Sequence, residues 1–231
     1  MAMIHSPKII TSGLTLCLDA GNRKSYSGTG TPWVNLIDKN SSGSLVNSPT
    51  FSNNNSGYFS FDGSNDYCTL PSTGIVAGNE LSFCVWNFGI SVSRTIVWFQ
   101  NSSGERILNV HLPWADGTIY FDAGAGVGTF DRIGKSAGTE YQGWNYWVFT
   151  KNATTGTMKI YRNGVEWHAG TGFTRVIENP SGQGYLALLP ASGGGPLYHN
   201  GYIAEVKLYN IELSDQQIKQ NFNATRRRFG I

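Results

Sequence analysis

Turn-forming residues interrupt this chain at short intervals, and most runs between them are too short for helices. RTIVWFQ (94–100), ERILNVHL (105–112) and GTIYFDA (117–123) are separated only by NSSG and PWADG. Runs of this kind, rich in β-branched and aromatic residues and bounded by Gly, Asn, Asp and Pro, are typical of strands joined in hairpins. No helical period occurs before residue 211. The pattern therefore predicts an all-β fold, a two-sheet antiparallel β-sandwich or jelly roll of about eleven or twelve strands.

Composition agrees with one mostly β domain. Charged residues make up 14% of the 231 residues, aromatic residues 13%, and glycines number 29. A chain of this length buries a full core without disulfides or metals, so Cys17, Cys68 and Cys84 are expected to be buried free thiols. With no repeat and no shift in composition, we expect an N-terminal arm (1–12), one jelly-roll domain (13–224) and a C-terminal basic tail (225–231).

Two strand-like runs carry specific expectations. Glu80 to Ile90, ELSFCVWNFGI, is apolar on both faces, which predicts a strand covered on both sides. Gly201 to Asn210, GYIAEVKLYN, alternates cleanly. Its two-residue period predicts one set of side chains in the core, Ala204, Val206 and Leu208, and one set facing out, Glu205, Lys207 and Tyr209.

The C-terminal segment is the one place where a helix is expected. Ser214 and Gln217 have the spacing of a capping box. Leu213, Ile218 and Phe222 then fall on one stripe. A helix of about ten residues is marginal alone, so it should depend on docking that stripe onto the sandwich.

Three arginines, Arg226, Arg227 and Arg228, follow the helix. They compensate the helix dipole or make subunit contacts, and Phe229 and Ile231 are candidate apolar pins. A formal net charge of only +2, from 17 basic and 15 acidic side chains, argues against a nucleic-acid partner. The N-terminus lacks the apolar run of a signal peptide, and no stretch is long enough to span a bilayer, so we expect no membrane association and synthesis in a cytoplasm.

Several motifs in order resemble the landmarks of the laminin-G-like, concanavalin-A-like jelly rolls. They are LDAGN (18–22), YFSFDGSNDY (58–67), ELSFCVWNF (80–88), GWNYWVFTKNATTGTMKIYRNGVE (143–166) and GYIAEVKLYNIELSDQQIKQNF (201–222). The resemblance covers residues 13–224, nearly the whole chain.

The ending, with the start KIITSGLTLCLDAGN (8–22), resembles virion structural proteins of tailed bacteriophages, of the marine or cyanophage type. This resemblance implies a non-enzymatic structural protein located in the virion and assembled in the host cytoplasm. It would be a capsid decoration or cement protein, or a tail accessory protein. Its partners would be the major capsid protein or tail proteins and further copies of itself, with Trp86 and Phe88 as additional candidate subunit contacts.

The alternative is a lectin-like carbohydrate-binding module that recognises host surface polysaccharide. Jelly rolls of this type stack sugars on exposed aromatic rings. Trp33, Trp114 and Trp167 lie at loops or strand ends and are the candidate sugar or partner contacts. The other four tryptophans are expected in the core: Trp86, Trp98, Trp144 and Trp147.

FDGSNDY supplies Asp62, Asn65 and Asp66, oxygen ligands of the type that calcium takes. The same residues are turn formers, and Ala204 stands where calcium-binding relatives carry an aspartate, so a structural turn is favoured.

No catalytic residue is assigned from the sequence. The glutamates are scattered rather than paired at alternate positions of one strand, and no histidine stands beside an ordered Ser or Cys motif. We therefore expect no enzymatic activity and no cofactor.

Overall fold

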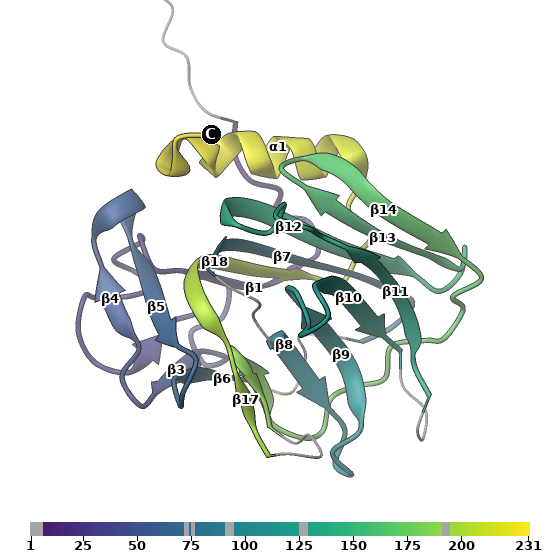
Figure 1. Cartoon of the computed structure of the whole chain (residues 1–231), viewed down its shortest axis with the longest axis horizontal. Helices are drawn as coiled ribbons and strands as arrows, with labels where there is room; N and C mark the ends of the chain where they lie inside the picture. The colour runs from purple at the N-terminus through teal and green to yellow at the C-terminus, as the bar shows by residue number, and fades with distance from the viewer. Residues whose placement is uncertain (1–6, 72–73, 75–76, 91–94, 125–128, 191–194) are drawn as a thin grey trace, which may run out of the picture.

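Two eight-stranded antiparallel sheets face each other, and one short helix lies on the outer face of the first sheet (Figure 1). The computed structural model describes residues 7–71, 74, 77–90, 95–124, 129–190 and 195–231. The two-sheet antiparallel sandwich with a short C-terminal helix predicted from the sequence is confirmed.

Sheet A follows the order β14-β13-β12-β7-β18-β5-β4, and β1 also pairs with β18. Its strands are β1 (Leu14–Asp19), β4 (Thr50–Ser52), β5 (Tyr58–Asp62), β7 (Glu80–Gly89), β12 (Gly143–Asn152), β13 (Thr157–Arg162), β14 (Val165–Thr171) and β18 (Asn200–Tyr209).

Sheet B follows the order β11-β10-β9-β8-β15-β6-β3-β2. Its strands are β2 (Pro32–Trp33), β3 (Gly43–Val46), β6 (Tyr67–Leu70), β8 (Thr95–Gln100), β9 (Arg106–His111), β10 (Thr118–Ala123), β11 (Asp131–Ser136) and β15 (Gly184–Leu186). The remaining elements are the pair β16 (Leu188–Leu189) and β17 (Leu197–Tyr198), the 3-10 helices η1 (Asn54–Ser56) and η2 (Arg226–Phe229), and α1 (Asp215–Thr225).

The main core fills the space between the two sheets. Phe149 of β12 lies 6.0 Å from Phe83 of β7 and 5.6 Å from Phe121 of β10, measured between ring centroids, so the rings join sheet A to sheet B.

The cysteines behave as expected from the sequence: all three are buried and free, and burial raises the pKa of the Cys68 thiol to about 12.

Strand β7 is covered on both faces, as its sequence predicts. Phe83 and Val85 point into the main core, whereas Cys84 and Trp86 lie in a second apolar cluster beneath the C-terminal helix. Trp86 is fully buried and stacks on Phe229 at a centroid distance of 4.0 Å. The chain therefore supplies its own cover for the outer face of sheet A.

Helix α1 begins and docks as predicted. Ser214 Oγ accepts from the Gln217 backbone N–H, and Gln217 Oε1 accepts from the Ser214 backbone N–H, so both halves of the capping box are present. Leu213, Ile218 and Phe222 are buried against sheet A. Docking of this stripe stabilises a helix too short to persist by itself.

The residues predicted as a terminal tail are folded onto the sandwich. Arg226–Phe229 continue α1 as the 3-10 helix η2, and Phe229 is buried, whereas Ile231 is 40% exposed and is no apolar pin. We call residues 213–229 the C-terminal strap. Beside it, Ile10 of the N-terminal arm donates its N–H to Asn221 Oδ1 and accepts from the Tyr209 hydroxyl; residues 1–6 lie outside the described chain.

The alternation predicted for β18 is interrupted. A register shift between Ile203 and Glu205 moves Ala204 out of the main core into the cluster beneath the strap. Glu205 and Lys207 do not face solvent: both are buried there, and they form an ion pair. Tyr209, also predicted outward, is fully buried in the same cluster. The sequence prediction for these four residues is corrected, because the alternation within one strand shows neither the register shift nor that the C-terminal helix lies over this strand.

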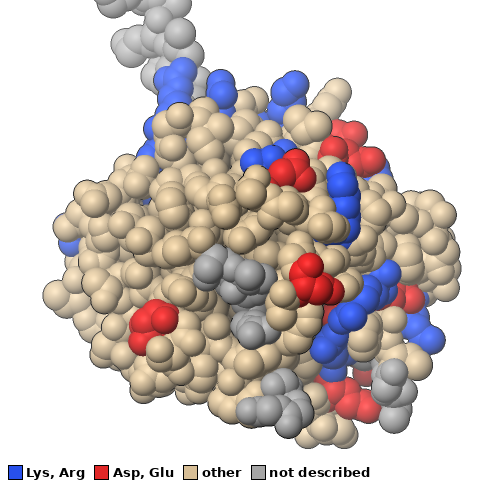
Figure 2. All heavy atoms as spheres, viewed as in Figure 1, with Lys and Arg blue, Asp and Glu red and all other residues tan. Residues whose placement is uncertain are grey.

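Charges are sparse over most of the face seen in Figure 2, and acidic and basic groups lie close together mainly on its right-hand side. No helix in the described part of the chain is long and apolar enough to cross a membrane.

Phe229→Ala should lower the free energy of unfolding by about 3 kcal/mol, because it opens a cavity beside Trp86. Urea denaturation followed by tryptophan fluorescence measures this loss. Ile231→Ala is the matched control, because Ile231 is exposed, and it should leave stability nearly unchanged. Equal effects of the two substitutions would contradict this account of the strap.

His199 should make the fold sensitive to acid. Its ring is fully buried, accepts from the Asn87 amide at 3.0 Å, and has its pKa lowered to about 3 by that burial. An unfolded histidine titrates near pH 6.5, so between about pH 6.5 and 3 the unfolded state binds the extra proton and stability falls as pH falls, by up to about 1.4 kcal/mol per pH unit. Denaturation curves at several pH values should show a shallower dependence for His199→Gln than for the native chain. Parallel pH profiles would contradict the assignment.

Candidate functional site

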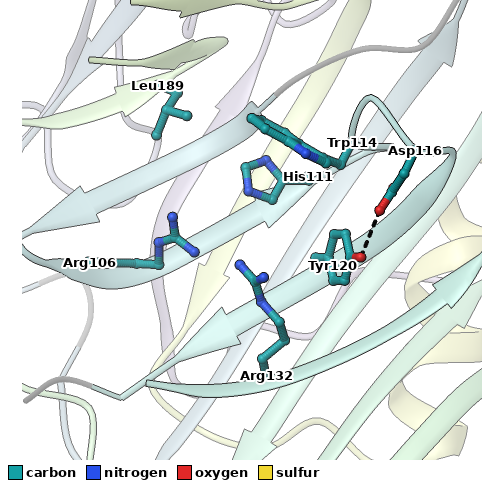
Figure 3. Close-up of a pocket in the computed structure, with 7 residues that line it drawn as sticks. All are labelled: Arg106, His111, Trp114, Asp116, Tyr120, Arg132 and Leu189. Carbon is teal, nitrogen blue, oxygen red and sulfur yellow. Dashed lines mark hydrogen bonds between the residues drawn. The ribbon is translucent and has the colours of Figure 1, made fainter. Parts of the chain in front are cut away.

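A hollow of about 360 Å³ lies on the outer face of sheet B, where β9, β10 and β11 run side by side (Figure 3). Volumes of this size are typical of small-ligand sites. The lining residues are Arg106, His111, Trp114, Asp116, Tyr120, Arg132 and Leu189.

Strand register assembles this surface. Asp122 of β10 stands opposite Asn109 of β9 on one side and Arg132 of β11 on the other. Tyr120, two residues earlier, stands opposite His111. Because side chains alternate between faces, these polar residues share the outer face while their neighbours, such as Phe121, enter the core.

A buried carboxylate anchors the site. The Asp122 side chain is fully buried and accepts from Arg132 Nε at 2.6 Å, Arg132 Nη2 at 2.9 Å and Asn109 Nδ2 at 3.1 Å. Arg106 Nη1 donates to the same carboxylate. Four charged or amide donors thus converge on one side chain, which makes Asp122 a counter-ion that positions two arginines.

Aromatic rings hold the two guanidinium groups in place. Arg106 lies over Phe130 at 4.5 Å and over Trp98 at 5.1 Å, and Arg132 lies over Tyr120 at 4.6 Å. Both guanidinium groups point into the hollow and toward each other (Figure 3). Burial lowers the pKa of Arg106 from its ordinary value, and the neighbouring charge of Asp122 opposes that shift.

The floor and rim of the hollow are also ordered. His111 Nε2 accepts from Asn109 Nδ2 at 2.9 Å, which assigns the ring proton to Nδ1, beside Thr95 Oγ1 at 3.0 Å. The His111 ring lies 4.4 Å from the Trp114 ring. At the rim, Tyr120 donates its hydroxyl to Asp116 Oδ2 at 2.8 Å.

Of the three tryptophans predicted to be exposed, the structure places only Trp114 at the hollow. Trp33 is fully buried and packs edge-on against Phe59, so its prediction as a surface contact is corrected. Trp167 is partly buried, lies edge-on to Trp147 and donates to Glu140 Oε2 at 2.9 Å, away from the hollow.

The residues predicted to contact another subunit do not form one surface in the structure. Trp86 is fully buried under the strap, which leaves no surface for another chain. Arg228 binds Asp19 at 2.9 Å within the same chain, whereas Arg226 and Arg227 are exposed. Phe88 is partly buried among three other rings on the outer face of sheet A: Tyr58, Trp144 and Tyr202.

The calcium candidates lie in the turn after β5. Asp62 Oδ1 accepts from the backbone N–H groups of Ser64 at 2.8 Å and Asn65 at 3.2 Å, and these bonds lower the pKa of Asp62. Within the described ranges, no three His, Cys, Asp or Glu side chains are grouped to hold a metal ion. Binding by Asp62, Asn65 and Asp66 stays a prediction.

Sequence reasoning missed most of the hollow, although a signal was present. Asn109 and His111 are two residues apart in one hairpin strand, and Tyr120 and Asp122 are two apart in the next. Polar side chains at alternate positions of adjacent strands share one face. The pairing partner Arg132 lies in a glycine-rich stretch with a weak strand pattern.

A second hollow, of about 550 Å³, lies at the start of α1. Two of its polar groups are already engaged within the protein: Tyr161 donates to Asp215 at 2.7 Å, and Lys159 pairs with Glu166, outside the lining, at 3.1 Å. The hollow on sheet B is the stronger candidate because its arginine groups are directed at open space.

Residues 62–219 match the laminin G family described as the concanavalin A-like lectin/glucanases superfamily. The chain belongs to this superfamily. A search of curated protein sequences finds no significant match.

Solved structures with the same fold include binding domains of botulinum neurotoxins and one domain of an arabinanase. The binding domain of botulinum neurotoxin DC in complex with rat synaptotagmin II gives a TM-score of 0.71 at 15% identity, over 92% of this chain and 52% of that chain. The ligand-binding domain of botulinum neurotoxin serotype D in complex with N-acetylneuraminic acid gives a TM-score of 0.66 at 14% identity. The match covers 91% of this chain and 50% of that chain. The third structure is domain 4 of AbnA, a GH43 extracellular arabinanase from Geobacillus stearothermophilus, in complex with arabinotriose. It gives a TM-score of 0.66 at 16% identity, and the match covers 92% of this chain and 99% of that chain. At these identities the likeness shows the fold alone, and this chain spans about half the length of the neurotoxin domains.

Asp122→Ala should destabilise the domain by about 3 kcal/mol, because it leaves two neighbouring arginines without their shared counter-ion. Urea denaturation measures the change. Asp116→Ala is the control: its carboxylate is at the exposed rim, so stability should barely change. A tolerated Asp122→Ala would show that the network does not support the fold.

Proposed function

We propose that this domain is a non-catalytic saccharide-binding module whose site is the hollow on sheet B. The observation that carries the proposal is the combination of ring surfaces with polar groups directed into one cavity of ligand size. Trp114 and Tyr120 line it together with Arg106, Arg132 and Asp116. Saccharides are recognised in this way, with an aromatic ring against the sugar face and hydrogen bonds to the hydroxyl groups.

The solved complexes support the proposal by analogy. The arabinanase domain is described with arabinotriose and the serotype D domain with N-acetylneuraminic acid. The synaptotagmin complex shows that a domain of this fold also binds protein. Protein binding is therefore the outcome to expect if a broad saccharide screen fails.

The absence of catalysis stays part of the proposal. The Asp122 carboxylate is buried and accepts hydrogen bonds from Arg106, Arg132 and Asn109, so it serves as their counter-ion rather than as a group that faces a substrate. The carboxylate pair that glycoside hydrolysis requires was also not found in the sequence.

A structural role in a phage particle is the second candidate. It rests on the resemblance of the chain's ending and start to virion proteins. The fold itself uses Phe222 and Phe229 of that ending inside the protomer, so virion contacts would fall to exposed residues of the ending such as Arg226 and Arg227. Mass spectrometry of purified particles tests this role, since a virion component would be present at a copy number set by particle symmetry.

Trp114→Ala should weaken saccharide binding at least about tenfold, because a ring that stacks on a sugar contributes one to a few kcal/mol. A glycan array followed by calorimetric titration of each hit measures the affinity. Trp144→Ala is the matched control, because Trp144 lies on sheet A. Circular dichroism checks that both variants are folded. Equal loss in both variants, or no saturable binding by the native chain, would overturn the proposal.

A further inference from the structure

The hollow holds two cations and only one fully buried anion. Arg106 and Arg132 share the Asp122 carboxylate, which offsets one of the two positive charges. Asp116, the acidic residue of the lining, is exposed at the rim, where it accepts from Tyr120 and from the Thr118 N–H. The arginine end of the hollow therefore carries a local positive charge, and the Asp116 end a negative one.

Arg132 keeps a donor that no hydrogen bond among the described residues uses. It donates through Nε and Nη2 to Asp122, which leaves Nη1. The Nε–H of Arg106 has no partner within the described chain, but it is buried and is not accessible to a ligand. The Arg106 and Arg132 side chains are 20% and 38% exposed, so an entering group can reach the exposed part of each.

An anionic group suits this position better than a hydroxyl group. Guanidinium groups form charge-assisted, forked hydrogen bonds with planar oxyanions. Two like charges held side by side also repel each other, and a bound anion reduces that repulsion. The aromatic faces of Phe130 and Tyr120 already fix the guanidinium planes, so little ordering is needed on binding.

The opposite end of the hollow limits the class of ligand. Asp116 offers a carboxylate that accepts from hydroxyl groups and repels a second anion. Trp114 supplies a ring surface between the two ends (Figure 3). A polyanion such as a nucleic acid meets Asp116 unfavourably, whereas a sugar ring with one anionic group and several hydroxyl groups matches both ends.

We propose that the ligand of this hollow is an acidic saccharide whose anionic group, a carboxylate or a sulfate, binds between Arg106 and Arg132. The inference rests on the saccharide-binding function proposed above and names its ligand class.

The test compares matched ligands by calorimetric titration. Neutral oligomers that end in a single galacturonate, glucuronate or mannuronate unit are each paired with their carboxyl-reduced counterpart, which has the same rings and no charge, and with a form of that counterpart that carries one sulfate. At least one anionic form should bind about tenfold or more tightly than its neutral counterpart, as expected for one charged hydrogen-bonded contact. Binding of that form should weaken as salt is raised. A preference for the uronate identifies a carboxylate, and a preference for the sulfated form identifies a sulfate.

Variants locate the effect at the arginines. Arg132→Gln should remove the preference for the anionic form, and Arg132→Lys, which keeps the charge but not the fork, should retain part of it. Lys135→Gln is the control, because it removes the same charge from β11 at a residue that lies over Trp167 and outside the hollow.

The outcomes distinguish a failure of the acidic-ligand proposal from a failure of the saccharide-binding proposal. Equal binding of charged and neutral oligomers, with both lost in Trp114→Ala, overturns the acidic ligand and leaves saccharide binding intact. A preference for the anion that survives in Arg132→Gln also overturns it. No binding of any of these oligomers overturns the acidic ligand class, whereas saccharide binding as such is overturned only if the glycan array also shows no saturable binding.

Discussion

The fold depends on covering the second face of β7. Trp86 is on the central strand of sheet A and points away from the main core, so its ring would be exposed in a two-layer sandwich. The strap solves this problem: Phe229 and Phe222 stack on Trp86, and Thr225 Oγ1 accepts from its indole N–H at 2.8 Å. Aromatic burial of this size ranks among the largest contributions that single side chains make to stability.

Covering that face has consequences for neighbouring residues. Glu205 and Lys207 are buried under the strap and form an ion pair. A single charge would be tolerated on a solvent-exposed face, but a buried charge is costly unless it is paired. The strap also brings the N-terminal arm against α1 through Asn221. The outer face of sheet A is thus covered by the strap and the N-terminal arm, whereas the outer face of sheet B presents a polar hollow.

The hollow on sheet B holds an unfavourable interaction that a ligand can relieve. The guanidinium groups of Arg106 on β9 and Arg132 on β11, the two strands that flank β10, repel each other, and Asp122 of β10 compensates them only in part. Such arrangements are tolerated where preorganised donors serve recognition. The distribution of charge, positive at the arginines and negative at Asp116, distinguishes this surface from the second hollow, where Lys159 and Glu166 already neutralise each other.

The sequence by itself determined the sandwich, the burial of β7 on both faces and the capped helix, because periodicity, turn residues and capping are local properties. It also named Trp114, which lines the hollow, as one of three candidate contacts. Tertiary structure decided which rings are exposed: Trp33 at a strand end proved fully buried. It also decided the site, since Arg106, Asp122 and Arg132 meet only after β9, β10 and β11 pair in register. Pairing between strands is a long-range property, and the alternation within each strand cannot specify it.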